Sequence, residues 1–225
     1  MNLTLFDLDG TLIETDSDHA FGEFLVQVGW ADKDRFKQRN DQFYAEYLAG
    51  TIDVAAYLDF ATAAWRTRPE HEALAMRERF MLEVMRPAVH ERASALVHQH
   101  QRAGDRVAIV TATNEFVTRP IADLFGIDTL IAVELERDAQ GRATGRSKGV
   151  PTFREGKVIR VEQWLAGLGH AASDFGRITF YSDSHNDLPL LEWATHPVAT
   201  NPGARLAQVA AERGWPILRL FEREE

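Results

Sequence analysis

The sequence predicts an α/β fold: a Rossmann-like parallel sheet core with helices on both faces and an inserted all-helical cap. Short apolar runs alternate with segments of helical periodicity over most of the 225 residues, a pattern typical of parallel sheets that are covered on both faces. The alternation stops between about residues 16 and 85, where apolar residues recur only at helical spacing. We therefore assign residues 1–15 and 86–225 to the core and residues 16–85 to the cap.

Six short apolar runs are expected to form the strands, and five periodic segments the core helices. The strands are expected at 3–8, 106–110, 129–133, 177–181, 197–200 and 216–220, and the helices at 92–102, 115–125, 158–168, 188–193 and 204–213. The segment 134–155 is polar and contains several glycines, which favours a small hairpin or an irregular excursion.

The cap segment holds no convincing strand, and its apolar spacing predicts about four helices. It is inserted directly after the first strand, where the chain leaves the carboxyl end of the sheet. Ligands of open α/β sheets bind at that edge, so we favour a lid or specificity domain. Helices that merely cover the sheet are the alternative.

Composition limits the possible functions. Hydrophobic residues make up 45% and charged residues 26%, as in ordinary globular proteins. The net charge of -9 disfavours nonspecific binding to nucleic acid or to anionic membranes. The absence of cysteine excludes disulfides, thiol catalysis and cysteine-ligated zinc. We expect no signal peptide, no membrane span and a cytoplasmic location, because acids follow within the first ten residues and no apolar run approaches 18 residues.

Asp7 and Asp9 stand two apart where the first strand ends, and residues at that spacing in an extended chain face the same way. Such a pair can share one metal ion, or one acid can attack while the other handles a proton. Gly10 permits a sharp exit from the strand, and the hydroxyl of Thr11 can bond to a phosphate oxygen or to backbone. Taken alone, the motif also fits a turn capped by acids.

Two further motifs suit an anion. Thr111 is followed by the start of a helix, where free backbone N–H groups favour negative charge; a plain helix cap by Thr113 or Asn114 is the alternative. Lys157 lies at the head of the next helix, which is the unfavourable end of the macrodipole for a cation. It therefore suits the neutralisation of a phosphate, although a surface lysine is the simpler explanation.

A fourth motif follows the strand at 177–181 and contains Asp183, Asn186 and Asp187. Oxygen ligands of this kind suit magnesium, and helix capping is the alternative. His185 fits a local hydrogen bond better than a metal ligand.

All four motifs lie at strand ends, and the carboxyl ends of parallel strands share one edge of the sheet. Like charges brought to ~4 Å there cost about 4 kcal/mol per pair at an effective dielectric constant of ~20. A divalent cation, here Mg²⁺, together with Lys157 relieves that repulsion. The pattern therefore predicts metal-dependent handling of an anionic group.

At these residues the chain resembles the haloacid dehalogenase-like superfamily, over nearly its whole length and in all four motifs. The helical insertion after the first motif is similar to that of the phosphoserine phosphatase-like subfamily (IB). The resemblance implies a phosphomonoesterase that acts on a small phosphate ester through an aspartyl-phosphate. It implies that Asp7 attacks phosphorus and that Asp9 protonates the leaving oxygen and then activates water.

The same resemblance implies the other roles. Thr111 and Lys157 hold phosphate oxygens, and Asp183 joins Asp7 and the backbone carbonyl of Asp9 on magnesium. Asn186 and Asp187 support the metal and the lysine. Thr11, Asp16 and Asn114 are expected to bind substrate.

Segments 14–25 and 151–157 resemble the histidinol-phosphate phosphatases of that subfamily. Phosphoserine phosphatases carry an acid nine positions after the nucleophile that meets the substrate amine. Asp16 falls at that spacing but is shorter than their usual glutamate, so an amino-bearing phosphate other than phosphoserine is favoured. Capping of the first lid helix by Asp16 or Ser17, with Asp18 in its first turn, is the alternative. His19 is interpreted as structural.

Several other functions share this core. A phosphoserine phosphatase, another small-metabolite phosphatase, a phosphomutase and a non-catalytic phosphate-binding domain are the alternatives. Retention of all the motif acids and of the lysine disfavours the non-catalytic one, and the presence of Asp9 disfavours a dehalogenase. Four arginines of the cap are candidates to contact a substrate carboxylate: Arg35, Arg39, Arg66 and Arg68.

Overall fold

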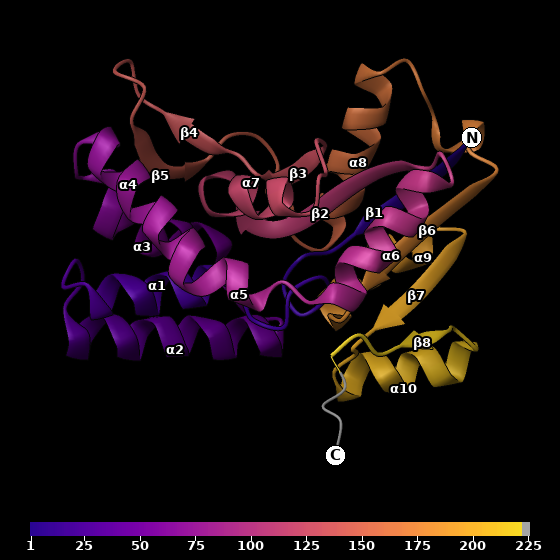
Figure 1. Ribbon diagram of the computed structural model, residues 1–225, viewed down its shortest axis with the longest axis horizontal. Coiled ribbons are helices and arrows are strands. Elements are labelled where there is room, and N and C mark those ends of the chain that lie inside the picture. The colour runs from indigo at the N-terminus through magenta and orange to yellow at the C-terminus, as the bar shows by residue number, and fades with distance from the viewer. Residues whose placement is uncertain (222–225) are drawn as a thin grey trace.

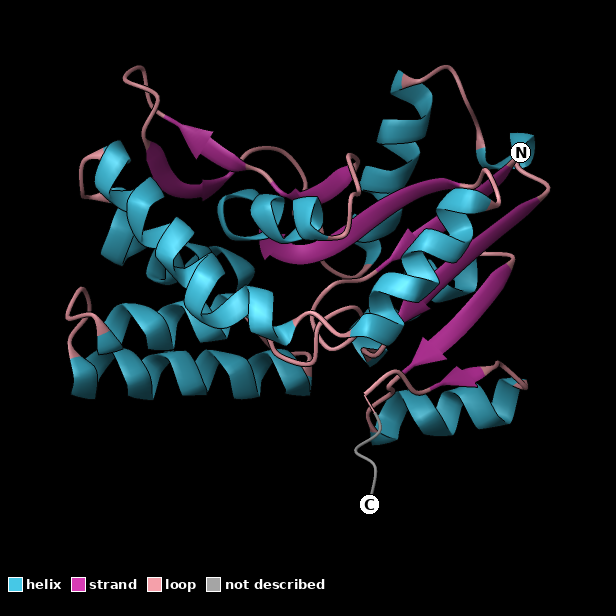
Figure 2. Cartoon of the chain, viewed as in Figure 1, coloured by secondary structure: helices cyan, strands magenta, loops and turns pink. Residues whose placement is uncertain are grey.

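The computed structural model describes residues 1–221 and has a six-stranded parallel sheet at its centre (Figures 1 and 2). The strand order is β3-β2-β1-β6-β7-β8, so the first strand of the chain lies in the interior of the sheet and is paired on both sides. The strands are β1 Asn2–Phe6, β2 Arg106–Asn114, β3 Leu130–Val133, β6 Arg177–Ser182, β7 His196–Thr200 and β8 Ile217–Leu218.

Different helices cover the two faces of the sheet, because alternate residues of a strand point to opposite faces. Leu3 and Leu5 of β1 pack on the side of α8 (Glu155–Gly167), α9 (Leu188–Trp193) and α10 (Ala204–Arg213). Phe6 packs on the other side, with α6 (Glu91–Arg102) and α7 (Glu115–Leu124). The predicted parallel sheet with helices on both faces is confirmed.

Four helices lie between β1 and the return of the chain to the sheet, which confirms the helical insert: α1 Ser17–Gln27, α2 Lys33–Ala49, α3 Val54–Arg66 and α4 Glu70–Phe80. A π-helical turn, Met81–Met85, and the short α5, Arg86–Ala88, lead back to the core. Asp16, Asp32 and Asp53 each accept a backbone N–H in the first turn of a cap helix and so fix where these helices begin. Within residues 1–221 no helix combines the length and apolarity needed to cross a membrane.

The cap is attached to the core by packing as well as by the chain. Trp65 of α3 stacks on Phe116 of α7, with ring centroids 3.9 Å apart and an interplanar angle of 10°. The predicted hairpin is present as β4 (Leu135–Arg137) and β5 (Ala143–Ser147) and lies against the cap helices (Figure 1). Gly145 of this hairpin has a φ of 86°, a left-handed conformation that favours glycine.

All six strands differ from the prediction at one end or both, and the ends of β1 and β2 bear on the site. β1 ends at Phe6 because the carbonyl of Leu8 already accepts the N–H groups of Thr11, Leu12 and Ile13 in a tight turn. β2 continues to Asn114, because Asn114 pairs with Val133 after a shift of register that follows Val110.

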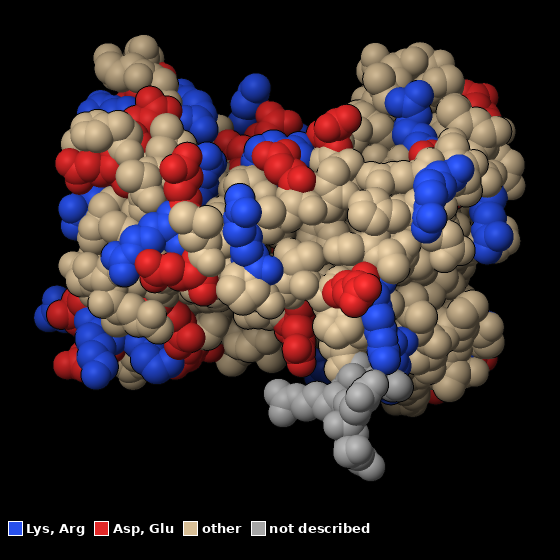
Figure 3. Space-filling model, in the orientation of Figure 1, with Lys and Arg blue, Asp and Glu red and all other residues tan. Residues whose placement is uncertain are grey.

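The surface shown in Figure 3 carries basic and acidic side chains in alternation, notably over the cap. Many form exposed ion pairs, such as Arg79 with Glu83 at 2.6 Å. Pairs of this kind are screened by solvent and contribute little to stability.

Trp65→Ala is expected to lower the free energy of unfolding by about 3–5 kcal/mol, because it removes a buried aromatic ring and leaves a cavity beside Phe116. Urea denaturation followed by circular dichroism measures the loss. Leu82→Ala is the matched control, since Leu82 is 61% exposed. Equal effects of the two substitutions would contradict the role given to Trp65.

Candidate active site

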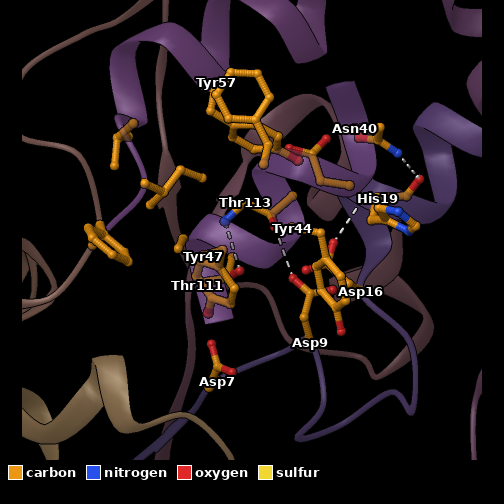
Figure 4. Close-up of a pocket in the computed structure, with 16 residues that line it drawn as sticks. Asp7, Asp9, Asp16, His19, Asn40, Tyr44, Tyr47, Tyr57, Thr111 and Thr113 are labelled. Carbon is orange, nitrogen blue, oxygen red and sulfur yellow. Dashed lines mark hydrogen bonds between the residues drawn. The ribbon is translucent and has the colours of Figure 1, made fainter. Parts of the chain in front are cut away.

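The carboxyl ends of β1, β2 and β6 meet beside the cap, and residues of the first two sequence motifs line one cavity there (Figure 4). Lys157 and Asp183, from the other two motifs, do not line this cavity but lie next to Asp7 and Thr11. Asp7 follows β1 directly, and its N–H donates to the carbonyl of Tyr181 at 2.9 Å, which holds it in line with the sheet. In the view of Figure 4, Asp7 lies at one end of the cavity and Tyr57 of the cap at the other.

Lys157 lies between Asp7 and Asp187 and is only 1% exposed. Its Nζ donates to Asp7 Oδ1 at 2.8 Å and to Asp187 Oδ2 at 2.7 Å, while Ser182 also donates to Asp187. Burial by itself lowers the pKa of Lys157, but Asp187 and Asp7 together raise it above its ordinary value. The lysine therefore stays charged, and it is not the surface side chain that the sequence left as an alternative.

The loop before α8 places Lys157. Arg154 adopts a φ of 51°, and a Cβ at Gly156 would lie 2.0 Å from the carbonyl oxygen of Pro151. Only glycine permits this contact, which turns the start of α8 toward the sheet edge. Lys157 is thus held at the start of α8, the unfavourable end of the macrodipole for a cation, by the buried carboxylates of Asp7 and Asp187.

Burial raises the pKa of Asp7 to about 7, and the neighbouring Lys157 opposes that shift. The carboxylate of Asp9 is turned toward the cap, where its oxygens accept the N–H of Ser17 at 2.7 Å and the hydroxyl of Thr113 at 2.9 Å. Burial, followed by repulsion from Asp16, raises the pKa of Asp9 to about 7. Asp9 is thus suited to hold and release a proton near neutral pH.

Thr11 connects the acids of two strands. Its hydroxyl lies 3.3 Å from both Asp7 Oδ2 and Asp183 Oδ1, and it accepts the N–H of Asp183 at 3.0 Å. The expected contact between Thr11 and a substrate phosphate is not supported, because the hydroxyl is fully buried between these groups. Gly10 lets the side chain of Asp183 lie close to the loop after β1, since a Cβ there would lie 2.3 Å from Asp183 Oδ2.

This arrangement fits a divalent cation. Burial, then repulsion from Asp7 and Asp187, raises the pKa of Asp183 well above its usual range, and a cation relieves such crowding. The buried Oδ1 of Asn186 has no hydrogen-bond partner within the described chain. Asp7, Asp183 and the backbone carbonyl of Asp9 would hold the ion, and oxygen ligands of this kind suit magnesium.

Asn186 also contacts the cap. Its Nδ2 donates to the carbonyl of Tyr47, near the end of α2, at 2.9 Å. A Cβ at Gly50 would lie 3.0 Å from the other amide atom. The loop that supports the expected metal is therefore in direct contact with the cap.

Thr111 and Asn114 differ in their positions. Thr111 lines the cavity, and its Oγ accepts the N–H of Thr113 at 3.1 Å, which leaves its hydroxyl hydrogen free for a phosphate oxygen. Asn114 is not among the lining residues. Its Oδ1 caps α7 through Val117, and its Nδ2 donates to Asp18 at 3.3 Å, so it supports the cavity wall from behind and does not contact substrate.

Asp16 is the N-cap of α1, where it accepts the N–H of His19 at 2.8 Å, and it also lines the cavity, so its position is compatible with the proposed contact to a substrate amine. His19, interpreted as structural, lines the cavity too. None of the four cap arginines proposed to contact a substrate carboxylate lines this cavity. The cap also supplies lining residues that the sequence did not single out as functional: Asp18, Asn40, Phe43, Tyr44, Tyr47, Ile52, Val54 and Tyr57.

Asp18→Asn is expected to stabilise the protein above pH 7. Burial raises the pKa of Asp18 to about 7 from an ordinary value of 3.8, so the folded state binds the proton more tightly than the unfolded state. The contribution of Asp18 to stability is full below pH 3.8 and is lost as pH rises through 7, by about 4 kcal/mol in all.

Thermal unfolding of Asp18→Asn and the wild type at pH 5.5 and 8.5 measures this effect. The gain in Tm should be larger at pH 8.5. An equal gain at both pH values would show that the charge of Asp18 is not the cause.

The comparisons with known proteins agree with this geometry. The family model described as haloacid dehalogenase-like hydrolase matches residues 4–192. A histidinol-phosphatase of Neisseria meningitidis is 42% identical over 96% of this chain and 98% of its own length. The phosphoserine phosphatase SerB1 of Mycobacterium tuberculosis is 31% identical over 94% of this chain and 68% of its own.

Solved structures show the same fold. A Bordetella pertussis protein of unknown function has a TM-score of 0.92 and 46% identity, over 98% of this chain and 99% of that one. A substrate-bound phosphoserine phosphatase has a TM-score of 0.68 and 16% identity, over 99% of this chain and 94% of that one. Family, fold and site together place this chain in the haloacid dehalogenase-like hydrolase family, among its phosphoserine phosphatase-like phosphatases.

Proposed function

We propose that this phosphatase hydrolyses histidinol phosphate, in a reaction that requires Mg²⁺. The observation that carries the substrate is the charge of the cavity. Four acids line it, Asp7, Asp9, Asp16 and Asp18, and none of its described lining residues is lysine or arginine. Such a cavity suits a phosphate ester with basic nitrogen groups.

The same observation disfavours phosphoserine. Phosphoserine carries a carboxylate that must be desolvated in the cavity, and a buried carboxylate without a cationic or hydrogen-bonding partner is costly. Histidinol phosphate bears an alcohol-derived ester, an amine and an imidazole, and no carboxylate. The similarity to the histidinol-phosphatase of Neisseria meningitidis over nearly the full length of both chains supports this choice.

In the first step, a carboxylate oxygen of Asp7 attacks phosphorus while the bond from phosphorus to the ester oxygen breaks. Asp9 gives its proton to that oxygen, and the alcohol leaves. Lys157, 2.8 Å from Asp7, balances negative charge beside the nucleophile, and the hydroxyl of Thr111 donates to a phosphate oxygen. Covalent capture of this kind divides one difficult hydrolysis into two easier steps.

In the second step, Asp9, now a carboxylate, takes a proton from water. The water oxygen attacks phosphorus, the bond to Asp7 breaks, and inorganic phosphate is released. The N–H of Ser17 and the hydroxyl of Thr113 hold Asp9 in place throughout. When bound by Asp7, Asp183 and the Asp9 carbonyl, Mg²⁺ neutralises charge and orients the phosphoryl group.

Asp7→Asn is expected to lower kcat by at least about 10⁴-fold, because an amide cannot act as the nucleophile. Steady-state release of phosphate measures the loss. The fold should persist, since an amide oxygen can still accept from Lys157, and thermal unfolding checks this. Turnover near the wild-type rate would disprove the assignment of the nucleophile.

Phosphate release from histidinol phosphate, phosphoserine and p-nitrophenyl phosphate, each with Mg²⁺, tests the substrate. The kcat/KM for histidinol phosphate should exceed that for phosphoserine by about 10²-fold or more, because the cavity leaves the carboxylate of phosphoserine unpaired. Excess chelator should stop all three reactions, and added Mg²⁺ should restore them. A preference for phosphoserine would overturn the proposed substrate.

A further inference from the structure

Asp18 is a buried carboxylate for which the reaction described above has no use. It lies in the first turn of α1, is 5% exposed and lines the cavity. Its two oxygens accept from Nδ2 of Asn114 at the long distances of 3.3 and 3.5 Å, and the nearby Tyr57 of α3 lowers its pKa, against the larger effect of burial. No lysine or arginine in residues 1–221 forms an ion pair with it.

Asp16 and Asp18 occupy different parts of the site. Asp16 lines the enclosed cavity and also the opening beside Gly10 and Asp183, close to the reacting end. Asp18 lines only the enclosed part, together with Tyr57, which lies far from Asp7 in Figure 4. A substrate that extends from Asp7 into the cavity therefore passes Asp16 at its opening and can reach Asp18 within.

A carboxylate in this position is unfavourable without a cationic partner, because burial removes its hydration. The same loss of hydration raises the pKa of Asp18 to about 7. The surrounding walls are aromatic, with Phe43, Tyr47 and Tyr57, and aromatic faces favour flat, delocalised cations. The missing partner therefore has the chemistry of a protonated or N–H-bearing heterocycle.

We propose that Asp18 is a specificity-determining residue that binds a second basic nitrogen group of the substrate, while Asp16 receives the amine. The substrate class is an aminoalkyl phosphate with a basic heterocycle at its far end. This proposal rests on the proposed function, because the imidazole of histidinol phosphate is such a heterocycle. It assigns the amine to Asp16, the N-cap residue of α1, and the ring to Asp18 in the first turn of that helix.

Asp18→Asn and Asp16→Asn form a matched pair that separates the two subsites. The substrates are histidinol phosphate, which has both groups, and O-phosphoethanolamine, which has only the amine. In Asp18→Asn, kcat/KM for histidinol phosphate should fall at least tenfold more than for O-phosphoethanolamine, mainly through KM, because a hydrogen bond to a charged group is lost. In Asp16→Asn the two losses should be similar.

Equal losses on both substrates in Asp18→Asn would overturn the proposal, because a merely structural role of Asp18 affects every substrate alike. Misfolding does not confuse the result, since the same substitution is expected to raise stability above pH 7.

A binding measurement keeps this proposal distinct from the proposed function. Histidinol should inhibit the hydrolysis of p-nitrophenyl phosphate, and Asp18→Asn should raise its inhibition constant at least tenfold, with a smaller change for ethanolamine. That result supports the Asp18 subsite whether or not histidinol phosphate is hydrolysed. If histidinol binds in this way but its phosphate is not hydrolysed, the proposed function fails and the subsite stands. No inhibition of the wild type by histidinol, or equal inhibition of both proteins, would overturn the subsite.

Discussion

The structure of the site depends on the crowding of carboxylates at one edge of the sheet. Asp7, Asp183 and Asp187 converge there, and among the described residues Lys157 is a buried cation that contacts Asp7 and Asp187 but not Asp183. Buried charges of one sign repel strongly and lose their hydration. The lysine offsets part of that cost, and a divalent cation between Asp7 and Asp183 would offset more. Binding of such an ion would therefore stabilise this edge of the sheet as well as supply the chemistry of the proposed function.

The cap takes part in the same electrostatic arrangement. Backbone N–H groups at the start of α1 donate to Asp9 and Asp16, so the position of this helix fixes the orientation of the Asp9 carboxylate. At the far end of α2, the carbonyl of Tyr47 accepts from Asn186. The cap thus contacts both the acid proposed to transfer the proton and the loop proposed to support the metal, and on that proposal a movement of the cap would change both.

The core and its motifs could be predicted because they follow from short-range rules. Strand periodicity locates the carboxyl edge, and Asp7, Lys157 and Asp183 meet there as expected. Side-chain direction was less predictable. Thr11 and Asn114 carry groups suited to a phosphate, but the fold turns them toward Asp183 and Asp18. The cap lining was missed for a related reason: apolar spacing marks Phe43 and Tyr47 as core residues, and only tertiary packing shows which of them face a ligand.

Asp18 illustrates why the cap matters for function. As a residue in the first turn of a helix, its negative charge is favourable for the macrodipole, and the sequence alone offers no further reason for it. Once the cap is folded onto the core, the same carboxylate is enclosed with aromatic rings and held weakly by Asn114. An acid that costs stability in the free protein persists where it is useful for binding. On the proposed function, the substrate would complete the balance of charge, with its phosphate beside Lys157 and its nitrogen groups beside Asp16 and Asp18.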